Sequence, residues 1–435
     1  MRISTSLIYD LGVATLQQRQ QGEVKLQQQL ASNQRVVTPA DDPIAAASAL
    51  DLKQTQALND QYHTNADRAK SALGLEEGAL TDMTNLLQDV KTLAVYAGNP
   101  VLSNADRASM ATELEGRYQE LLGIANRGDG NGQYLFSGYQ GATQPFAEAS
   151  PGNVTYAGDA GQRLAQIGPS RTIAINDSGD AVFRAIRNGN GTFTTAAGAA
   201  NSGGGVISAG TVTDPAKWNA AANARDFTIK FYVNAATPPV TTYDIVDNVN
   251  NVSLVTGAAP AAGPYLRTYV PGNAISLSTQ APPDTNPAPF DFGAALAIDG
   301  APASGDTFTV KASANQDIFT TLHGLITTLR NGTNAVAASV ASYQNSLNSA
   351  LSGLDNALDK VLTVRAGVGT RLKEIDTAQS SSADLSLQYA KTLSGLQDLD
   401  YAKAISDLNL EHFYLQAAQQ SFLKVTSLNL FSLLP

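Results

Sequence analysis

The spacing of hydrophobic residues changes along the chain and separates two helical ends from a different middle. Between Pro43 and about Ala97, apolar residues recur every seven positions in two parallel series. The first series holds Ala66, Leu73, Leu80, Leu87 and Ala94, and the second holds Tyr62, Ala69, Met83, Val90 and Ala97, with Glu76 as its one polar member. This repeat predicts a long helix in a coiled-coil-like bundle, roughly 80 Å long at 1.5 Å per residue.

This helix is predicted to stop at Asn99-Pro100, because a proline disfavours the helical conformation of the residue before it. A second helix is predicted to begin after Ser103, a good cap residue, and to end at the glycine-rich turn 127–132. Its apolar face holds Ala111, Leu114, Tyr118, Leu121 and Ala125.

Between about residues 140 and 310, apolar residues recur at every second position instead of every seventh. In the stretch 226–233 the apolar side chains of Phe227, Ile229, Phe231 and Val233 alternate with others, and 241–247 and 306–311 are similar. Such alternation predicts half-buried strands. We therefore expect one or two compact β modules with long loops in this region.

The seven-residue repeat returns near the C-terminal end. One series runs through Val340, Leu347, Leu354, Val361, Val368 and Ile375, and continues past Ser382 to Tyr389 and Leu396. After Asp400 the repeat takes a new register through Leu408, Leu415, Ala418, Phe422 and Val425. A helix with one apolar face must bury that face, and the two ends of the chain are available to each other.

These patterns predict a multidomain α+β fold. A long coiled-coil-like helical bundle would form from paired N- and C-terminal segments, with an inserted mostly-β domain at the tip. The predicted parts are an N-terminal assembly segment, helical when assembled (1–42), two halves of a helical rod (43–139 and 311–399), the β domain (140–310) and a C-terminal assembly segment (400–435). Because the two assembly segments have little apolar surface, we expect them to be mobile in the free monomer.

Composition narrows the function. The net charge is −10, from 28 Lys and Arg against 38 Asp and Glu, and the bases are scattered, which argues against a nucleic-acid partner. No apolar run is long enough to span a membrane, and the start MRISTSLIYD lacks the features of a cleaved signal peptide, so we expect no membrane insertion and another export route. The absence of cysteine excludes disulfides and thiolate zinc sites.

Sequence signals for catalysis are weak. His63, His323 and His412 fall in separate helical stretches, and none has a second histidine three or four residues away, as a helical metal site requires. No nucleophile elbow, Walker A loop or dinucleotide fingerprint occurs. Asp129 in the turn 127–132 lacks the other ligands of a calcium loop. We therefore expect no enzyme activity, no cofactor and no metal.

The adjacent acids Asp41 and Asp42 suggest a carboxylate pair, but the start of a helix explains them. Proline is favoured at the first helical position, so Asp42 before Pro43 is placed as the N-cap. Asp41 adds negative charge at the positive end of the helix dipole. No basic or histidine residue lies near the two acids in sequence that would make them a catalytic pair.

Several stretches carry a resemblance to a known family. They are MRISTS, RVVTPADDPIAAASAL, QYLFSGYQGATQPF at 133–146, VTYAGDAGQR at 154–163, and DLDYAKAISDLNLEHFYLQAAQQSFLKVTSLNLFSLL. In this order they resemble the bacterial flagellin superfamily. Within it, Asp41-Asp42-Pro43 and the block of Tyr134, Phe136, Ser137 and Gly138 are more similar to the hook-filament junction proteins than to flagellin. Residues 165–300 carry little of the pattern.

The resemblance implies a secreted, extracellular structural protein of the flagellum that supports motility. It would be exported unfolded through the flagellar type III apparatus and would form a homo-oligomeric ring at the hook-filament junction. Its partners would be the other hook-filament junction protein, flagellin and, before secretion, an export chaperone bound around 408–434. The expected assembly residues are Leu408, Leu415, Ala418, Phe422, Val425, Leu428, Leu430 and Phe431.

Two alternatives remain open from the sequence: a flagellin of the filament itself, and an adhesin built on the exposed β module. A secreted enzyme within the β module is disfavoured, because residues 140 to 310 contain no histidine and show no serine triad.

Overall fold

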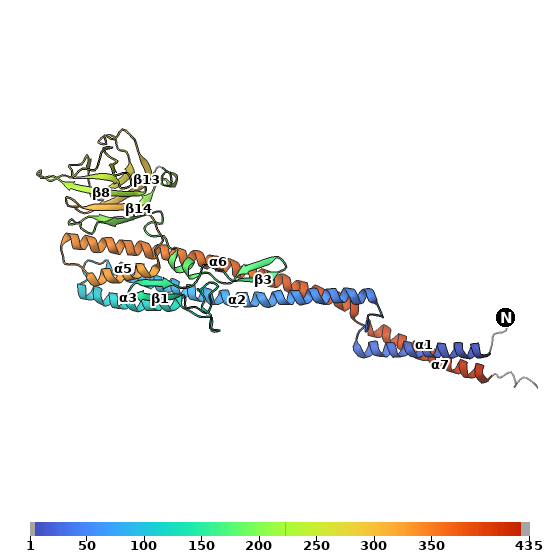
Figure 1. Cartoon of the computed structure of the whole chain (residues 1–435). Coiled ribbons are helices and arrows are strands. Elements are labelled where there is room, and N and C mark those ends of the chain that lie inside the picture. The colour runs from blue at the N-terminus through green and yellow to red at the C-terminus, as the bar shows by residue number, and fades with distance from the viewer. Residues whose placement is uncertain (1–4, 222, 428–435) are drawn as a thin grey trace, which may run out of the picture. The chain divides into compact units, whose positions relative to one another are not determined.

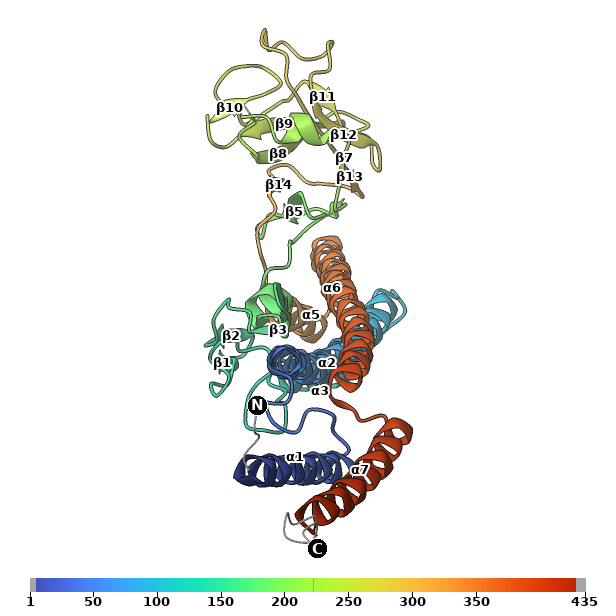
Figure 2. The same ribbon diagram turned by 90° about the vertical axis from the view of Figure 1, so that its right-hand side faces the viewer.

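The computed structural model describes residues 5–221 and 223–427, and its contacts group into two compact units. One unit holds the residues up to Asp67, Gln166–Arg171 and the residues from Ile375 on, and the other holds Arg68–Ala165 and Thr172–Glu374. Helices α2 (Pro43–Ala97) and α6 (Ala337–Gln397) contribute to both units. Figure 1 and Figure 2 show the elements from two directions.

The first unit pairs segments from opposite ends of the chain. Helices α1 (Thr5–Ser32) and α7 (Tyr401–Ser427) lie side by side in both views. In the same unit, the Asn59 side chain of α2 donates hydrogen bonds to the Ser382 carbonyl and the Ser386 hydroxyl of α6, both at 2.9 Å. The predicted pairing of N- and C-terminal helices is confirmed.

The second unit contains a helical part in which α3 (Asn104–Ala125) packs against α5 (Ile318–Asn331), beside α2 and α6. Helix α2 spans the predicted residues. Ser103 caps α3: its hydroxyl accepts a hydrogen bond from the Asp106 N–H, and the Asp106 carboxylate accepts one from the Ser103 N–H. The five residues predicted on the apolar face of α3 are all buried.

Two features of the helical part differ from the prediction. The predicted rod half 311–399 contains α5, but the sequence did not separate α5 from α6; α5 ends where Gly332 adopts a positive φ of 58° before α6 begins. The seven-residue repeat does not extend into α5, because α5 buries a broad face against α3, with Phe319, Leu322 and Leu325 among its buried residues. Glu76, the apparent break in the α2 repeat, is only 1 % exposed and therefore occupies a core position.

The β domain of the second unit holds two antiparallel sheets. Its elements are β5 (Phe193–Ala197), β6 (Val206–Ile207), β7 (Thr211–Val212), α4 (Pro215–Trp218), β8 (Asp226–Val233), β9 (Thr241–Asp247), β10 (Val252–Ser253), β11 (Arg267–Thr268), β12 (Ala274–Ser278), β13 (Asp291–Asp299) and β14 (Thr307–Ala312). The larger sheet has the order β10-β9-β8-β14-β5, with β11 also on β9, and the smaller has the order β12-β13-β6, with β7 also on β13.

The core of the β domain follows the predicted alternation in β8. Phe227, Ile229 and Phe231 are buried and lie opposite Asp247, Ile245 and Tyr243 of β9. They share one apolar cluster with Trp218 of α4 and with residues of the smaller sheet, so both sheets bury the same core.

A third region, between the helices and the β domain in sequence, holds the elements β1 (Phe146–Ser150), β2 (Asn153–Tyr156), β3 (Leu164–Gly168), β4 (Arg171–Ala174) and the π-helical turn η1 (Asp180–Arg184). The ring centre of Phe183 lies 5.1 Å from that of Phe136 and 5.2 Å from that of Phe146, both in edge-to-face contacts, and the Phe319 ring of α5 lies 5.4 Å from Phe146. The segment 133–146 therefore supplies an aromatic core.

The β domain is attached to α6 by two asparagines. Asn345 accepts a hydrogen bond from the Ile207 N–H at 2.8 Å and donates one to the Gly205 carbonyl at 3.0 Å. Asn356 donates to the carbonyls of Arg187 and Gly189, both at 2.8 Å. Their spacing of eleven residues is close to three helical turns, so both lie on one face of α6. Within the described part of the chain, no helix has the length and hydropathy to cross a membrane.

Candidate functional site

The pair of helices α1 and α7 is the candidate site, because both belong to the segments that the sequence assigns to assembly. The helices run antiparallel. The rings of Tyr9 and Phe422 lie 5.2 Å apart, and the Tyr401 hydroxyl donates to the Leu30 carbonyl at 3.3 Å. Partners up to several hundred positions apart in sequence are thus brought together by the fold.

Two glycines of α1 allow α7 to approach closely. A Cβ atom on Gly12 would lie 2.5 Å from Cδ2 of Phe422, and one on Gly22 would lie 3.1 Å from Oε1 of Glu411. Glycine inside a helix costs about 1 kcal/mol relative to alanine. The Gly12 position is explained by the space that the Phe422 ring occupies, and it sets the register of the pair.

Polar contacts complete the same register. Arg19 Nη1 lies 3.1 Å from Oε2 of Glu411, and the Arg19 guanidinium lies 5.3 Å from the ring centre of Tyr414. Glu23 Oε1 lies 3.2 Å from Nδ1 of His412. The Arg19 side chain is 43 % exposed, and exposed ion pairs contribute little to stability. These contacts therefore specify the register of α1 against α7 more than they stabilise the two helices.

Four of the five predicted assembly residues that the structure describes lie on the less exposed side of α7, and Val425 does not. Leu415 is buried, Leu408, Ala418 and Phe422 are half-buried, and Val425 is 48 % exposed. The remaining predicted residues, Leu428, Leu430 and Phe431, lie outside the described residues. Phe422 is the one whose partners are seen directly, namely Tyr9 and the Gly12 backbone.

Large apolar side chains also remain exposed on the α1–α7 pair, and the sequence analysis did not select most of them. They are Leu7, Tyr9, Leu11, Val24, Tyr401, Ile405, Leu410, Phe413, Tyr414, Leu423 and Val425, with exposed fractions from 42 % to 66 %. The sequence did contain a sign of these residues. Phe413 and Leu423, for example, lie between the repeat positions of α7 and give that helix a second apolar side. We call these residues the exposed apolar set.

Asp41 and Asp42 fasten the connection between α1 and α2. Asp42 Oδ1 accepts a hydrogen bond from the Ala45 N–H at 3.0 Å, the contact of an N-cap, and Asp42 Oδ2 lies 3.1 Å from Arg35 Nη1. Asp41 Oδ1 lies 2.8 Å from Lys25 Nζ, and Asp41 Oδ2 accepts from the Thr38 N–H at 2.8 Å. The bonds from Lys25 and then Thr38 lower the pKa of Asp41 to about 2. Both acids thus have basic partners, which sequence proximity had not indicated.

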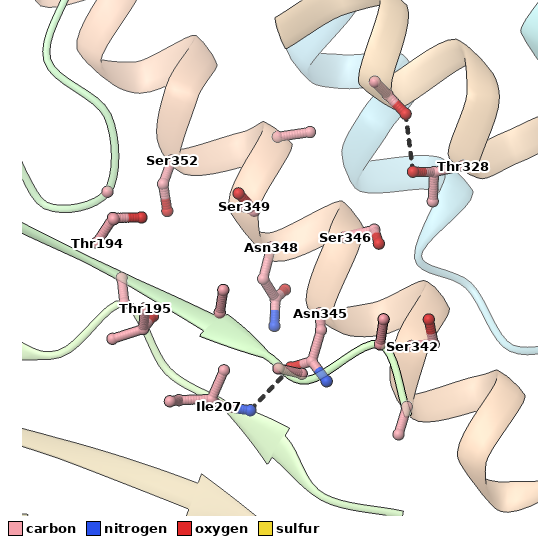
Figure 3. A pocket seen from close by; sticks show the side chains of 18 of the residues that line it. Thr194, Thr195, Ile207, Thr328, Ser342, Asn345, Ser346, Asn348, Ser349 and Ser352 are labelled. Atoms are coloured by element: carbon pink, nitrogen blue, oxygen red, sulfur yellow. Dashed lines mark hydrogen bonds between the residues drawn. The ribbon is translucent and has the colours of Figure 1, made fainter. Parts of the chain in front are cut away.

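A cleft of about 640 Å³ lies between the β domain and helices α5 and α6. In Figure 3, Asn348, Ser349 and Ser352 of α6 lie on the side of Thr194 and Thr195 of the β domain, and Asn345 is hydrogen-bonded to the Ile207 N–H. Ser346 lies on the other side of α6, toward Thr328 of α5. Among the described residues that line the cleft, none is Asp, Glu, Lys or Arg, and His323 makes no hydrogen bond to a hydroxyl there. The cleft therefore offers no base paired with a nucleophile.

The histidines and the glycine-rich turn provide no metal site. The three histidines lie on α2, α5 and α7. Asp129 Oδ1 accepts hydrogen bonds from the Asn131 and Gln133 N–H groups, so it closes the turn 127–132. Within residues 5–221 and 223–427, no three His, Asp or Glu side chains are grouped to hold a metal ion.

Comparison with known proteins points to one group. Residues 3–141 match the family model of the bacterial flagellin N-terminal helical region. The flagellar hook-associated protein 3 of Salmonella typhimurium is 29 % identical over 433 residues, which cover 100 % of this chain and 99 % of that protein. The flagellins among the relatives compared cover only 26 % to 34 % of this chain.

Solved structures agree in fold and in sequence. The crystal structure of flagellar hook-associated protein 3 from Legionella pneumophila is 30 % identical, has a TM-score of 0.69, and covers 79 % of this chain and 98 % of that one. The structure of the flagellar junction protein FlgL from the same organism is 29 % identical, with a TM-score of 0.68, and covers 81 % of this chain and 100 % of that one. The chain therefore belongs to the flagellar hook-associated protein 3 family, within the bacterial flagellin superfamily.

Proposed function

We propose that this chain is a structural subunit of the bacterial flagellum that forms the ring between the hook and the filament, outside the cell. The observation that carries this proposal is the extent of the similarity. Hook-associated protein 3 matches the chain along its whole length, including the β domain, whereas the flagellins compared match about a third or less. Because the flagellins compared lack a match to most of the chain, the residues that distinguish a junction subunit from a filament subunit would be spread over the whole fold.

The geometry of the α1–α7 pair supports an assembly role. The pair covers one side of α7 within the chain and leaves the exposed apolar set on its surface. Such exposed apolar side chains would be available for burial against another protein, and each buried Å² contributes about 25 cal/mol. In the ring, this surface would pack against neighbouring copies of the chain, and at the two faces of the ring against the other hook-filament junction protein and flagellin.

The remaining parts of the proposal concern export and chemistry. The chain would be secreted unfolded through the flagellar type III apparatus, with a chaperone bound to residues 408–434 beforehand. It would act as a structural subunit without enzymatic activity.

Deletion of the gene tests the proposed role. Electron microscopy of the deletion strain should show intact hooks without attached filaments, and flagellin should accumulate in the medium. Complementation with the full chain should restore filaments. Normal filaments in the deletion strain would overturn the proposal. Loss of filaments without flagellin in the medium would instead identify the chain as the filament subunit.

A further inference from the structure

Glu76 is a carboxyl group in the core of the second unit. Its side chain lies on α2 in the repeat position between Ala69 and Met83, and it is 1 % exposed. Oε1 accepts a hydrogen bond from the Asp177 N–H at 3.0 Å. Oε2 is buried and has no hydrogen-bond partner among the described atoms. An ionised carboxylate in this place would carry charge that the protein does not fully compensate.

Asp177 connects Glu76 to α6. The Asp177 carboxylate accepts a hydrogen bond from Arg371 of α6 and a second one, at 2.7 Å, from Gln162. Arg371 also donates to the Ala174 carbonyl at 3.3 Å. The segment 174–177, which follows β4, is therefore held by Glu76 of α2 on one side and by Arg371 of α6 on the other.

The charges around Glu76 favour its protonated form. Burial, and next the negative charge of Asp177, raise the pKa of Glu76 from 4.5 to about 8, while Arg371 opposes the shift. The neighbouring acid of α2, Glu77, is bound instead by Arg365 of α6 at 2.6 Å. The carboxyl group of Glu76 thus holds its proton at neutral pH, whereas Arg371 is engaged by Asp177.

We propose that Glu76, Asp177 and Arg371 form a proton-controlled latch, which holds the segment 174–177 on helices α2 and α6 while Glu76 is protonated and releases it when that proton is lost. Deprotonation places two carboxylates, buried Glu76 and half-buried Asp177, beside the single half-buried guanidinium of Arg371. Opening of the segment admits water to Glu76 and relieves this repulsion. Because Ala174 ends β4, opening also frees that end of the strand.

Hydrogen exchange of the full chain between pH 6.5 and 9.5, corrected for the intrinsic exchange rates, tests the latch. In the wild type, the amides of 174–177 should be protected below pH 8 and should lose protection above it by about tenfold per pH unit. In Glu76→Gln, which imitates the protonated acid, protection should persist to pH 9.5. Glu77→Gln is the matched control and should behave like the wild type.

Constant protection of 174–177 in the wild type over this range would overturn the proposal, and so would a loss in Glu76→Gln with the wild-type midpoint. If Glu76→Gln lacks the wild-type circular dichroism spectrum, carbon NMR of the wild type with labelled glutamate carboxyl groups decides. One carboxyl signal that titrates near pH 8 supports the latch. Titration of every glutamate below pH 6 refutes it.

Discussion

Replacement of Asp284 by alanine should destabilise the β domain strongly, because it breaks a buried ion pair. Arg267 of β11 and Asp284 in the loop after β12 meet through two hydrogen bonds of 2.8 and 2.6 Å, and their side chains are 1 % and 0 % exposed. Asp284 also accepts a hydrogen bond from the Gln280 N–H at 2.8 Å. The pair therefore fixes the loop 279–290 to the sheet.

These contacts determine how much stability Asp284→Ala should lose. Asp284→Ala leaves the Arg267 guanidinium in the core without its ion-pair partner; the carbonyls of Ser276 and Ser278 and the Tyr243 side chain remain beside it. Removal of one partner of a buried pair costs about 3 to 5 kcal/mol, since the other charge stays buried without compensation. Asp291 provides the control: it lies 2.6 Å from Lys217, and these side chains are 48 % and 50 % exposed. Asp291→Ala should cost about 1 kcal/mol or less.

The single tryptophan, Trp218, makes the measurement specific. It is 1 % exposed within the β core, so its fluorescence reports unfolding of this domain. Urea titrations of the wild type and both variants give the free energies of unfolding. If Asp284→Ala costs less than 1 kcal/mol, or no more than Asp291→Ala, the buried pair does not hold the loop and the reasoning fails.

Three further predictions concern the helices. The folded-state pKa of Asp41 is about 2 against 3.8 for the free group, so the stability that its ionised form contributes is complete above pH 3.8 and is lost as the pH falls through 2. The decrease in helix stability between pH 5 and pH 2, measured by urea unfolding followed by circular dichroism, should therefore be smaller in Asp41→Asn than in the wild type. Gly123→Ala should raise the free energy of unfolding by up to about 1 kcal/mol in a urea titration followed by circular dichroism, because outside the helix's own backbone and the two adjoining residues no described atom lies within 4 Å of the added Cβ; a decrease would contradict this. Phe422→Ala should increase cleavage of α1 by chymotrypsin, because it removes the ring that packs at Gly12, whereas Leu423→Ala, at a side chain that is 65 % exposed, should leave cleavage unchanged.

The helices with a regular repeat were predictable from sequence, as the bounds of α2 show. A seven-residue repeat constrains every turn of a long helix, and the proline after Asn99 marks its end. Strand β8 was predictable for the same reason, since its alternation specifies which side is buried. Helix α5 fell within the predicted rod half 311–399, but its bounds were not predictable, because its wide buried face follows no strict repeat.

The contacts of the candidate site depended on the fold. From the sequence alone, Gly12 is only a glycine that destabilises its helix. The structure shows that the Phe422 ring packs against it. In the sequence, Glu76 interrupts the apolar repeat of α2. In the structure it is buried beside Asp177, which lies about a hundred residues away in sequence. In both cases the partner is distant along the chain, and no local pattern encodes its position.

Immunogold labelling of intact flagella with an antibody against the β domain tests the central claim most directly. A junction subunit should appear in electron micrographs as one narrow band, where the filament meets the hook, on each flagellum. Label distributed along the length of the filament would contradict the account and would identify the chain as a filament subunit.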